Sequence, residues 1–235
     1  MFEIRKHYHE QLEELKTGTI RLAAMATEAI TAGTQALLDG DLSAAERVIA
    51  GDHRLDELTR TIEEQTYLVL ACQSPMASEL RALVATLRVV HELERCGDLM
   101  VNVAKATRRL HPRGLDPKAR GLLEQMGAQA ADQLRLAMDA FQDADVLKAA
   151  ALVDMDDVMD DLEKALFRAI FSAGAADEAA LQRAVQVALV GRFYERIADH
   201  AVNVGSRVRF MVTGVWPGHE DEAEEEEGPV SRTGP

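Results

Sequence analysis

The chain carries one polar motif twice, and this internal repeat limits it to an architecture made of two similar halves. Residues 91–102 read HELERCGDLMVN, and residues 193–203 read FYERIADHAVN. The offset between matching polar positions is 101 residues throughout. The pairs at this offset are Glu94 and Glu195, Arg95 and Arg196, Asp98 and Asp199, and Asn102 and Asn203.

The composition is typical of a helical protein. Apolar residues make up 47% of the chain but aromatic residues only 4%, so we expect almost no β-strand. Apolar periodicity predicts six long helices. Ser43 with Glu46 predicts the start of the second helix, and Ser74 before Pro75 predicts the start of the third. The expected helices span residues 3–38, 43–72, 75–110, 117–142, 146–172 and 178–212.

The fold predicted from these helices is all-α, with two tandem antiparallel three-helix bundles related by pseudo-symmetry. The segment 111–117 is rich in helix breakers and divides the first bundle, residues 1–111, from the second, residues 116–213. Residues 214–235 are acidic, begin and end with Gly and Pro, and lack apolar periodicity. They are predicted to form a disordered tail.

The repeated motif places acidic side chains on one face of a helix. Glu94 and Asp98 are four residues apart, and Asn102 follows after another four, so the three side chains share a face. Upstream at helical spacing, the same face carries Leu80 and Val84. We therefore expect the acidic residues to continue an apolar stripe that faces the core.

The middle helix of each half carries a second acidic pair. Asp52 and Asp56 in the first half match Asp156 and Asp160 in the second at an offset of 104 residues. In an antiparallel bundle the middle and last helices are neighbours. Asp56 lies 18 residues before the turn near residue 74, and Glu94 lies 20 residues after it. The two pairs of each half are therefore expected to meet at similar heights on facing helices.

Four converging carboxylates need compensation. Two like charges about 5 Å apart repel by roughly 3 kcal/mol at an effective dielectric near 20. Protonation, pairing with Arg95 or Arg196, or bound cations can each relieve this repulsion. Hard oxygen ligands with few nearby His or Cys side chains favour Mg, Mn, Ca or Fe over zinc. The alternative is that each acidic pair belongs to a solvated helix face.

The charge and motif content narrow the possible functions. The formal net charge is −14, which argues against nucleic acid as a partner. Cys72 and Cys96 form no C-x-x-C motif, and no apolar run is long enough for a membrane span or a signal peptide, so a cytoplasmic location is expected. The chain has no Gly-rich phosphate loop, no nucleophile elbow and no Glu-x-x-His motif. We therefore expect a protein that is not an enzyme.

These motifs resemble those of the PhoU family of phosphate transport system regulatory proteins. The family pattern E-R-I-G-D-x-x-x-N is similar to both copies of the repeated motif, and Gln73-Ser74-Pro75 with Glu79-Leu80-Arg81 is similar to the turn into the family's third helix. The resemblance covers residues 5 to 212. Two positions depart from the pattern, with Cys96 in place of Ile and Ala198 in place of Gly.

The resemblance implies a fold, metal sites and a role. Members have two tandem three-helix bundles, and the acidic motifs of some members bind multinuclear metal clusters. The matching metal candidates are Asp52, Asp56, Glu94, Asp98, Asp156, Asp160, Glu195 and Asp199, with Asn102, Asn203, Arg95 and Arg196 in support. The implied role is negative control of phosphate uptake and of the phosphate-starvation response. Such a protein links the ATPase subunit of the phosphate ABC transporter to a sensor histidine kinase, commonly as a homodimer, and reaches the membrane only through these partners.

Two other functions fit the residues. The first is a helical bundle that stores metal or carries out redox chemistry, which oxygen-dependent turnover of iron would reveal. The second is a structural helical protein without metal, which would melt at the same temperature after chelation.

Overall fold

Six helices account for nearly all of the chain that the structure describes, residues 2–174 and 176–215. The structure is a computed structural model, and it contains no β-strand within these residues. The helices are α1 (Phe2–Asp39), α2 (Leu42–Cys72), α3 (Ala77–Leu110), α4 (Pro117–Asp143), α5 (Val146–Ala173) and α6 (Glu178–Thr213). The all-α prediction is confirmed, and each helix starts and ends within two residues of its expected bounds. The predicted tail lies outside the described residues from residue 216 onward.

Two predicted helix starts were wrong. The N-cap of α2 is Asp41, whose Oδ1 accepts hydrogen bonds from the backbone N–H groups of Ser43 and Ala44. An aspartate two residues earlier thus satisfies the free N–H groups that Ser43 was expected to cap. Similarly, α3 begins at Ala77 rather than Pro75, and the Met76 N–H donates to Glu79 Oε2 at 3.3 Å.

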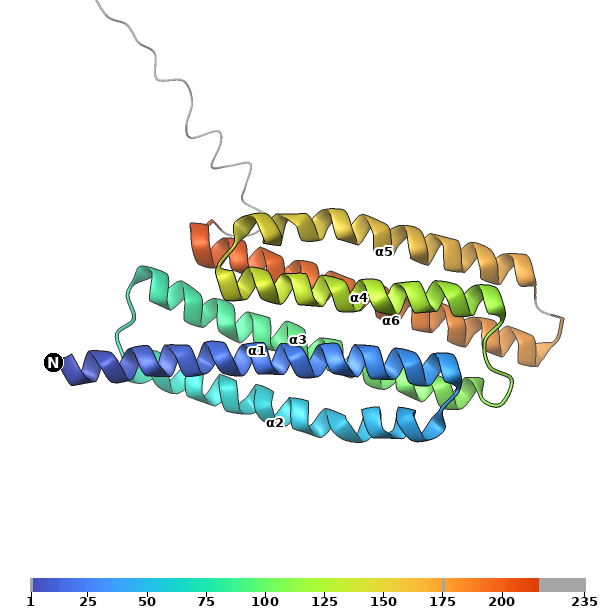
Figure 1. Cartoon of the computed structure of the whole chain (residues 1–235), viewed down its shortest axis with the longest axis horizontal. Helices are drawn as coiled ribbons and strands as arrows, with labels where there is room; N and C mark the ends of the chain where they lie inside the picture. Colours follow the sequence, from blue (N-terminus) through green and yellow to red (C-terminus); the bar gives the residue numbers. More distant parts are fainter. Residues whose placement is uncertain (1, 175, 216–235) are drawn as a thin grey trace, which may run out of the picture.

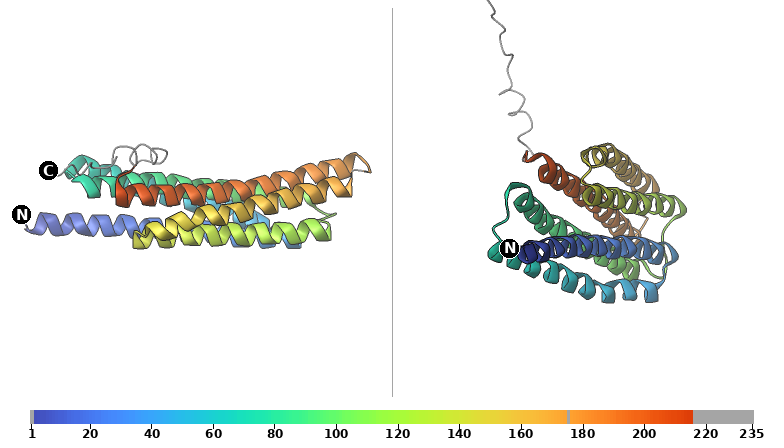
Figure 2. Two further views of the ribbon diagram at one scale, coloured as in Figure 1. Left: turned by 90° about the horizontal axis from the view of Figure 1, so that it is seen from above. Right: turned by 60° about the vertical axis from the view of Figure 1, so that its left-hand side comes forward.

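The two halves lie side by side and share one core (Figure 1). The α3 helix packs along α6, and α1 packs against α4 (Figure 2). The turn between α2 and α3 and the equivalent turn between α5 and α6 lie at opposite ends of the molecule. The core therefore crosses the boundary between the halves, as its buried side chains from four helices show: Leu22, Ile30, Leu93, Met100, Met126, Leu134, Tyr194 and Ile197.

A buried hydrogen bond also joins the halves. Tyr194 on α6 is fully buried, and its hydroxyl lies 2.7 Å from the Oγ1 atom of Thr34 on α1. Thr34 Oγ1 also donates to the carbonyl of Ile30. The phenol therefore has a partner in the core, as a buried tyrosine requires.

The prediction that the acidic residues continue a buried stripe was wrong. Leu80 is 43% exposed and Leu181 is 49% exposed. The buried face of α3 carries Leu83, Val90 and Leu93 instead. Because α3 contacts α1, α2 and α6, its core face points between those helices, and the stripe leading to Glu94 lies at the margin of that face. None of the described helices is both long and apolar enough for a bilayer crossing.

Candidate metal centre

The four acidic residues predicted in the first half come together where α2 faces α3. Burial raises the pKa of Asp52 to about 6, and the charges of Asp56, Asp98 and Glu94 contribute to the increase. The pKa of Glu94 is also raised, first by burial and then by Asp98, with a smaller contribution from Asp56. The two pairs therefore lie within electrostatic range of each other, and we call these four residues the first cluster.

A glycine lets Asp52 approach α3 closely. A Cβ atom on Gly97 would lie 3.2 Å from Asp52 Oδ1 and 3.3 Å from a methyl group of Leu55. Both distances are tighter than ordinary van der Waals contact. The preceding residue, Cys96, is fully buried, and burial raises the pKa of its thiol, so it is packed in the core as expected.

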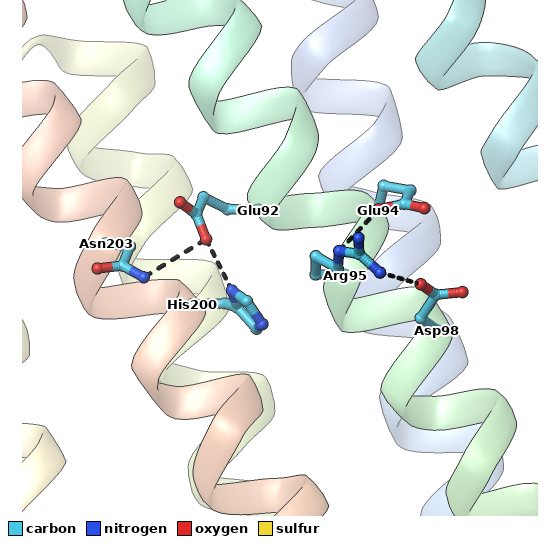
Figure 3. A network of polar contacts seen from close by, with 6 residues as sticks. All are labelled: Glu92, Glu94, Arg95, Asp98, His200 and Asn203. Atoms are coloured by element: carbon cyan, nitrogen blue, oxygen red, sulfur yellow. Dashed lines mark hydrogen bonds and ion pairs between the residues drawn. The ribbon is translucent and has the colours of Figure 1, made fainter.

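Arg95 compensates part of the charge in the first cluster (Figure 3). Its Nη1 donates to Asp98 Oδ2 at 3.0 Å, and its Nε lies 3.6 Å from Glu94 Oε2. Even so, Glu94 Oε2 is buried without a hydrogen bond. A cleft of about 410 Å³ is lined by Asp56, Thr59 and Glu94, among other residues. The first cluster therefore borders a solvent-open cleft, although Glu94 Oε2 itself is buried.

The second half repeats the arrangement between α5 and α6. Burial raises the pKa of Glu195 to about 7, with Asp199 as the next cause. The pKa of Asp156 is raised by burial and then by Asp199, with a contribution from Asp160. Glu195 Oε2, like its counterpart Glu94 Oε2, is buried without a hydrogen bond. These four acids form the second cluster.

One acidic residue of the second cluster was missed by the sequence reasoning. Glu163 on α5 contributes to the raised pKa of Glu195. At the offset of 104 residues its counterpart is Thr59, so the repeat gave no signal for it. The second cluster therefore includes an acid that was not among its four predicted members.

The arginine that pairs with the second cluster is Arg192, not the predicted Arg196. Arg192 Nη1 lies 2.5 Å from Glu195 Oε1 and 4.0 Å from Glu163 Oε1. Arg192 is three residues before Glu195, on the same helix face. The equivalent position in the first half is His91, which is exposed. In the first cluster a histidine thus stands where the second cluster has its pairing arginine.

Asn203 was predicted to support the acidic residues of the second half, but it contacts Glu92 of the first half instead (Figure 3). Its Nδ2 donates to Glu92 Oε2 at 3.4 Å, and His200 Nδ1 lies 2.7 Å from the same oxygen. Burial alone would raise the pKa of Glu92, but the hydrogen bond and charge of His200, together with Asn203 and Arg207, hold it below its usual value. Glu92 leaves α3 toward α6, on another side from Glu94. Asn102, the equivalent of Asn203, is half-buried one turn after Asp98.

The chemistry of both clusters fits a hard cation, although neither is arranged as a complete coordination shell. Each cluster offers carboxylates with raised pKa values and one buried carboxylate oxygen that accepts no hydrogen bond. Oxygen ligands of this kind suit Mg, Mn, Ca or Fe. Within the described residues, however, no three His, Cys, Asp or Glu side chains converge on one point. Binding would require exposed side chains such as Asp98, held by Arg95, to turn inward.

Comparison with known proteins identifies the family of the chain. The model of the PhoU domain matches residues 19–107 and 123–208. The chain belongs to the PhoU family. Among other PhoU proteins, phosphate-specific transport system accessory protein PhoU homolog 2 of Mycobacterium tuberculosis is 39% identical over 91% of this chain and 100% of its own length. The PhoU homolog of Caulobacter vibrioides is 31% identical, over 89% of this chain and 91% of its own.

Crystal structures of PhoU proteins have the same fold. PhoU from Pseudomonas aeruginosa superposes with a TM-score of 0.84 at 27% identity and covers 88% of this chain and 100% of its own. The phosphate transport system regulatory protein PhoU from Streptococcus pneumoniae superposes with a TM-score of 0.81, also at 27% identity, and covers 88% of this chain and 98% of its own. The tandem three-helix arrangement of this chain is therefore the PhoU fold.

Proposed function

We propose that this protein is a negative regulator of phosphate uptake and of the phosphate-starvation response. It acts in the cytoplasm as a homodimeric adaptor between the ATPase subunit of a phosphate ABC transporter and a phosphate-sensing histidine kinase. Support comes from its family, since relatives over about nine-tenths of the chain are named accessory proteins of the phosphate-specific transport system. The kinase enters the proposal through the regulatory role that the resemblance to the PhoU family implies.

The observation that carries the metal-binding part of the proposal is the pair of equivalent acidic clusters. Each lies between the middle and last helices of its half, and each contains a buried carboxylate oxygen without a hydrogen bond. Asp52, Asp56, Glu94 and Asp98 would hold cations in the first cluster. Asp156, Asp160, Glu195 and Asp199 would do so in the second, with Glu163 as an additional ligand. A bound divalent or trivalent ion would supply the positive charge that Arg95 and Arg192 provide only in part.

Cation binding would act on an adaptor by changing the repulsion between neighbouring helices. Without compensation, the carboxylates of α2 repel those of α3, and those of α5 repel those of α6. Neutralising both clusters would hold each helix pair together and change the charge where α2 meets α3 and where α5 meets α6. A partner that recognises these two surfaces would then distinguish the metal-bound protein from the metal-free protein. This role requires binding and no catalytic step.

Recovery of partners at high and low phosphate tests the adaptor role. Tagged protein is expected to recover the transporter ATPase and the kinase, with recovery that differs between the two phosphate levels. The matched variant carries Asp98→Asn and Asp199→Asn, which remove one acid from each cluster without changing side-chain size. Recovery of neither partner under either condition would contradict the adaptor role. Oxygen-dependent turnover of iron by the purified protein would instead favour metal storage or redox chemistry.

A further inference from the structure

An arginine-lined groove lies where α3 ends and α6 begins. Its volume is about 630 Å³, and its lining includes Arg109, Arg113 and Arg183, with Glu178 as the one acidic residue. Leu181 contributes an apolar wall and is 49% exposed. In a chain with a net charge of −14, three arginines around one hollow form a local positive surface.

The charges of these three arginines are not compensated by the fold. Arg109 Nη1 donates to Gln186 Oε1 at 3.3 Å, and a neutral amide does not offset the guanidinium charge. Within the described residues, none of the three forms an ion pair with a carboxylate. Other arginines of the chain do, and these are Arg95, Arg108, Arg120, Arg135 and Arg192. The groove therefore presents cations that are free to bind an external acidic group.

We infer that this groove binds the acidic C-terminal segment, residues 220–227, of a second copy of the chain. The segment reads EDEAEEEE and holds seven acids in eight residues. It is the densest run of negative charge in the sequence, and it complements a groove with three unpaired arginines. The inference does not rest on the proposed role in phosphate regulation.

The geometry of α6 explains why the segment must come from another copy. The groove lies at the end of the molecule where α3 meets α4 and α5 meets α6, whereas α6 ends at the opposite end (Figure 1). Arg183 lies thirty residues before Thr213, which corresponds to about 45 Å along the helix. Glu227, the last acid of the run, lies twelve residues after Val215 and reaches about 42 Å at most. Even at full extension, the run as a whole therefore cannot occupy the groove of its own chain.

Complementation between two variants of the full chain tests this inference. The groove variant carries Arg109→Glu, Arg113→Glu and Arg183→Glu; the tail variant carries Glu224→Lys, Glu225→Lys and Glu226→Lys. Sedimentation velocity at low salt is expected to show at least about tenfold weaker self-association for each variant alone, because several ion pairs are replaced by like charges. An equimolar mixture is expected to recover association, since the tail of one variant meets the intact groove of the other.

Controls separate charge effects from folding. The variant Arg21→Glu, Arg88→Glu, Arg135→Glu makes the same change in net charge at exposed positions elsewhere and is expected to associate like the original chain. A milder groove variant with Arg→Gln at the same three positions is expected to lose part of the association and to melt at the original temperature. Unchanged association in the groove variant would overturn the inference. Loss in the groove variant but not in the tail variant would also overturn it, because another acidic surface would then occupy the groove.

Discussion

The carboxylate of Asp52 on α2 lies directly over Gly97 on α3, so that a Cβ atom at Gly97 would be 3.2 Å from Asp52 Oδ1. The missing side chain brings the carboxylate against the neighbouring helix, next to Glu94 and Asp98. At the equivalent position the second half has Ala198, which is fully buried. The two clusters therefore differ in whether a glycine lies opposite the aspartate of the middle helix.

Substitution of Gly97 is predicted to weaken cation binding more than stability. In Gly97→Ala, the gain in helix propensity of about 1 kcal/mol opposes crowding against Asp52 and Leu55, which costs about 1–3 kcal/mol. The free energy of unfolding is expected to fall by no more than about 2 kcal/mol, measured by urea denaturation in chelator. The increase in melting temperature on adding Mn²⁺ is expected to shrink.

The matched control for this variant is Ala198→Gly in the second half. It is expected to lower stability by about 1 kcal/mol through helix propensity and by about as much again through loss of a buried methyl group, and to keep the Mn²⁺-induced increase in melting temperature. Equal Mn²⁺ responses in Gly97→Ala and Ala198→Gly would show that Gly97 has no special role in the first cluster.

The raised pKa values predict how stability changes with pH in the absence of metal. The pKa of Asp52 rises from 3.8 to about 6, and that of Glu195 from 4.5 to about 7. The folded chain therefore binds more protons than the unfolded chain between these values. The stability that these groups contribute is fully present below their unfolded pKa values and is lost as the pH rises through about 6 and 7.

Glu195→Gln tests this pH dependence of stability because it removes the charge of one of the two groups, Asp52 and Glu195. In chelator at pH 8 the variant is expected to be more stable than the original chain by about 1 kcal/mol, a rise in melting temperature of about 2–4 °C. Near pH 4 the difference is expected to vanish, since Glu195 is then protonated in both states. Thermal melts at the two pH values provide the measurement, and a difference that does not depend on pH would refute the assignment.

The contact between Glu92 and His200 is predicted to be replaceable by apolar side chains. At the offset of 101 residues, the counterparts of Glu92 and His200 are Phe193 and Leu99. His200→Leu alone leaves the buried carboxylate without its main partner and is expected to cost about 2–3 kcal/mol. Adding Glu92→Phe introduces the pair that the repeat already uses and is expected to restore most of that loss. Urea denaturation of the single and double variants measures the recovery; a double variant no better than the single one would argue against equivalent packing.

The hydrogen bond between Tyr194 and Thr34 is predicted to contribute to the contact between the halves. Tyr194→Phe removes a fully buried hydroxyl and leaves Thr34 with only its bond to the Ile30 carbonyl. The expected loss is about 1 kcal/mol of unfolding free energy. Tyr67→Phe serves as a control, because Tyr67 is 58% exposed and should tolerate the change. Equal effects of the two substitutions would contradict a role for the buried hydroxyl.

The sequence was sufficient for the helices and for placing the acidic pairs on neighbouring helices, because both follow from spacing. Helical period and the breakers at residues 111–117 define the six elements. The offsets of 101 and 104 residues place the acidic pairs on facing helices. The helix starts were less accurate, since Asp41 competes with Ser43 for the same N–H groups and only geometry selects between them.

Details of the site that depend on neighbouring helices could not be predicted from periodicity. The face leading to Glu94 looked buried because it is apolar, but the positions of α1, α2 and α6 around α3 leave Leu80 at the margin. Glu163 has no acidic counterpart, and Arg192 replaces His91, so the repeat predicted neither. Glu92 meets His200 across the boundary between halves, a contact without any local sequence signal.

Anomalous diffraction from crystals grown with Mn²⁺ tests whether the two carboxylate clusters are cation sites. We expect anomalous peaks between α2 and α3, next to Asp52 and Glu94, and between α5 and α6, next to Asp156 and Glu195. Both peaks are expected to disappear in the Asp52→Asn, Asp156→Asn variant. Crystals that contain Mn²⁺ but show no peak at either cluster would contradict cation binding by these carboxylates.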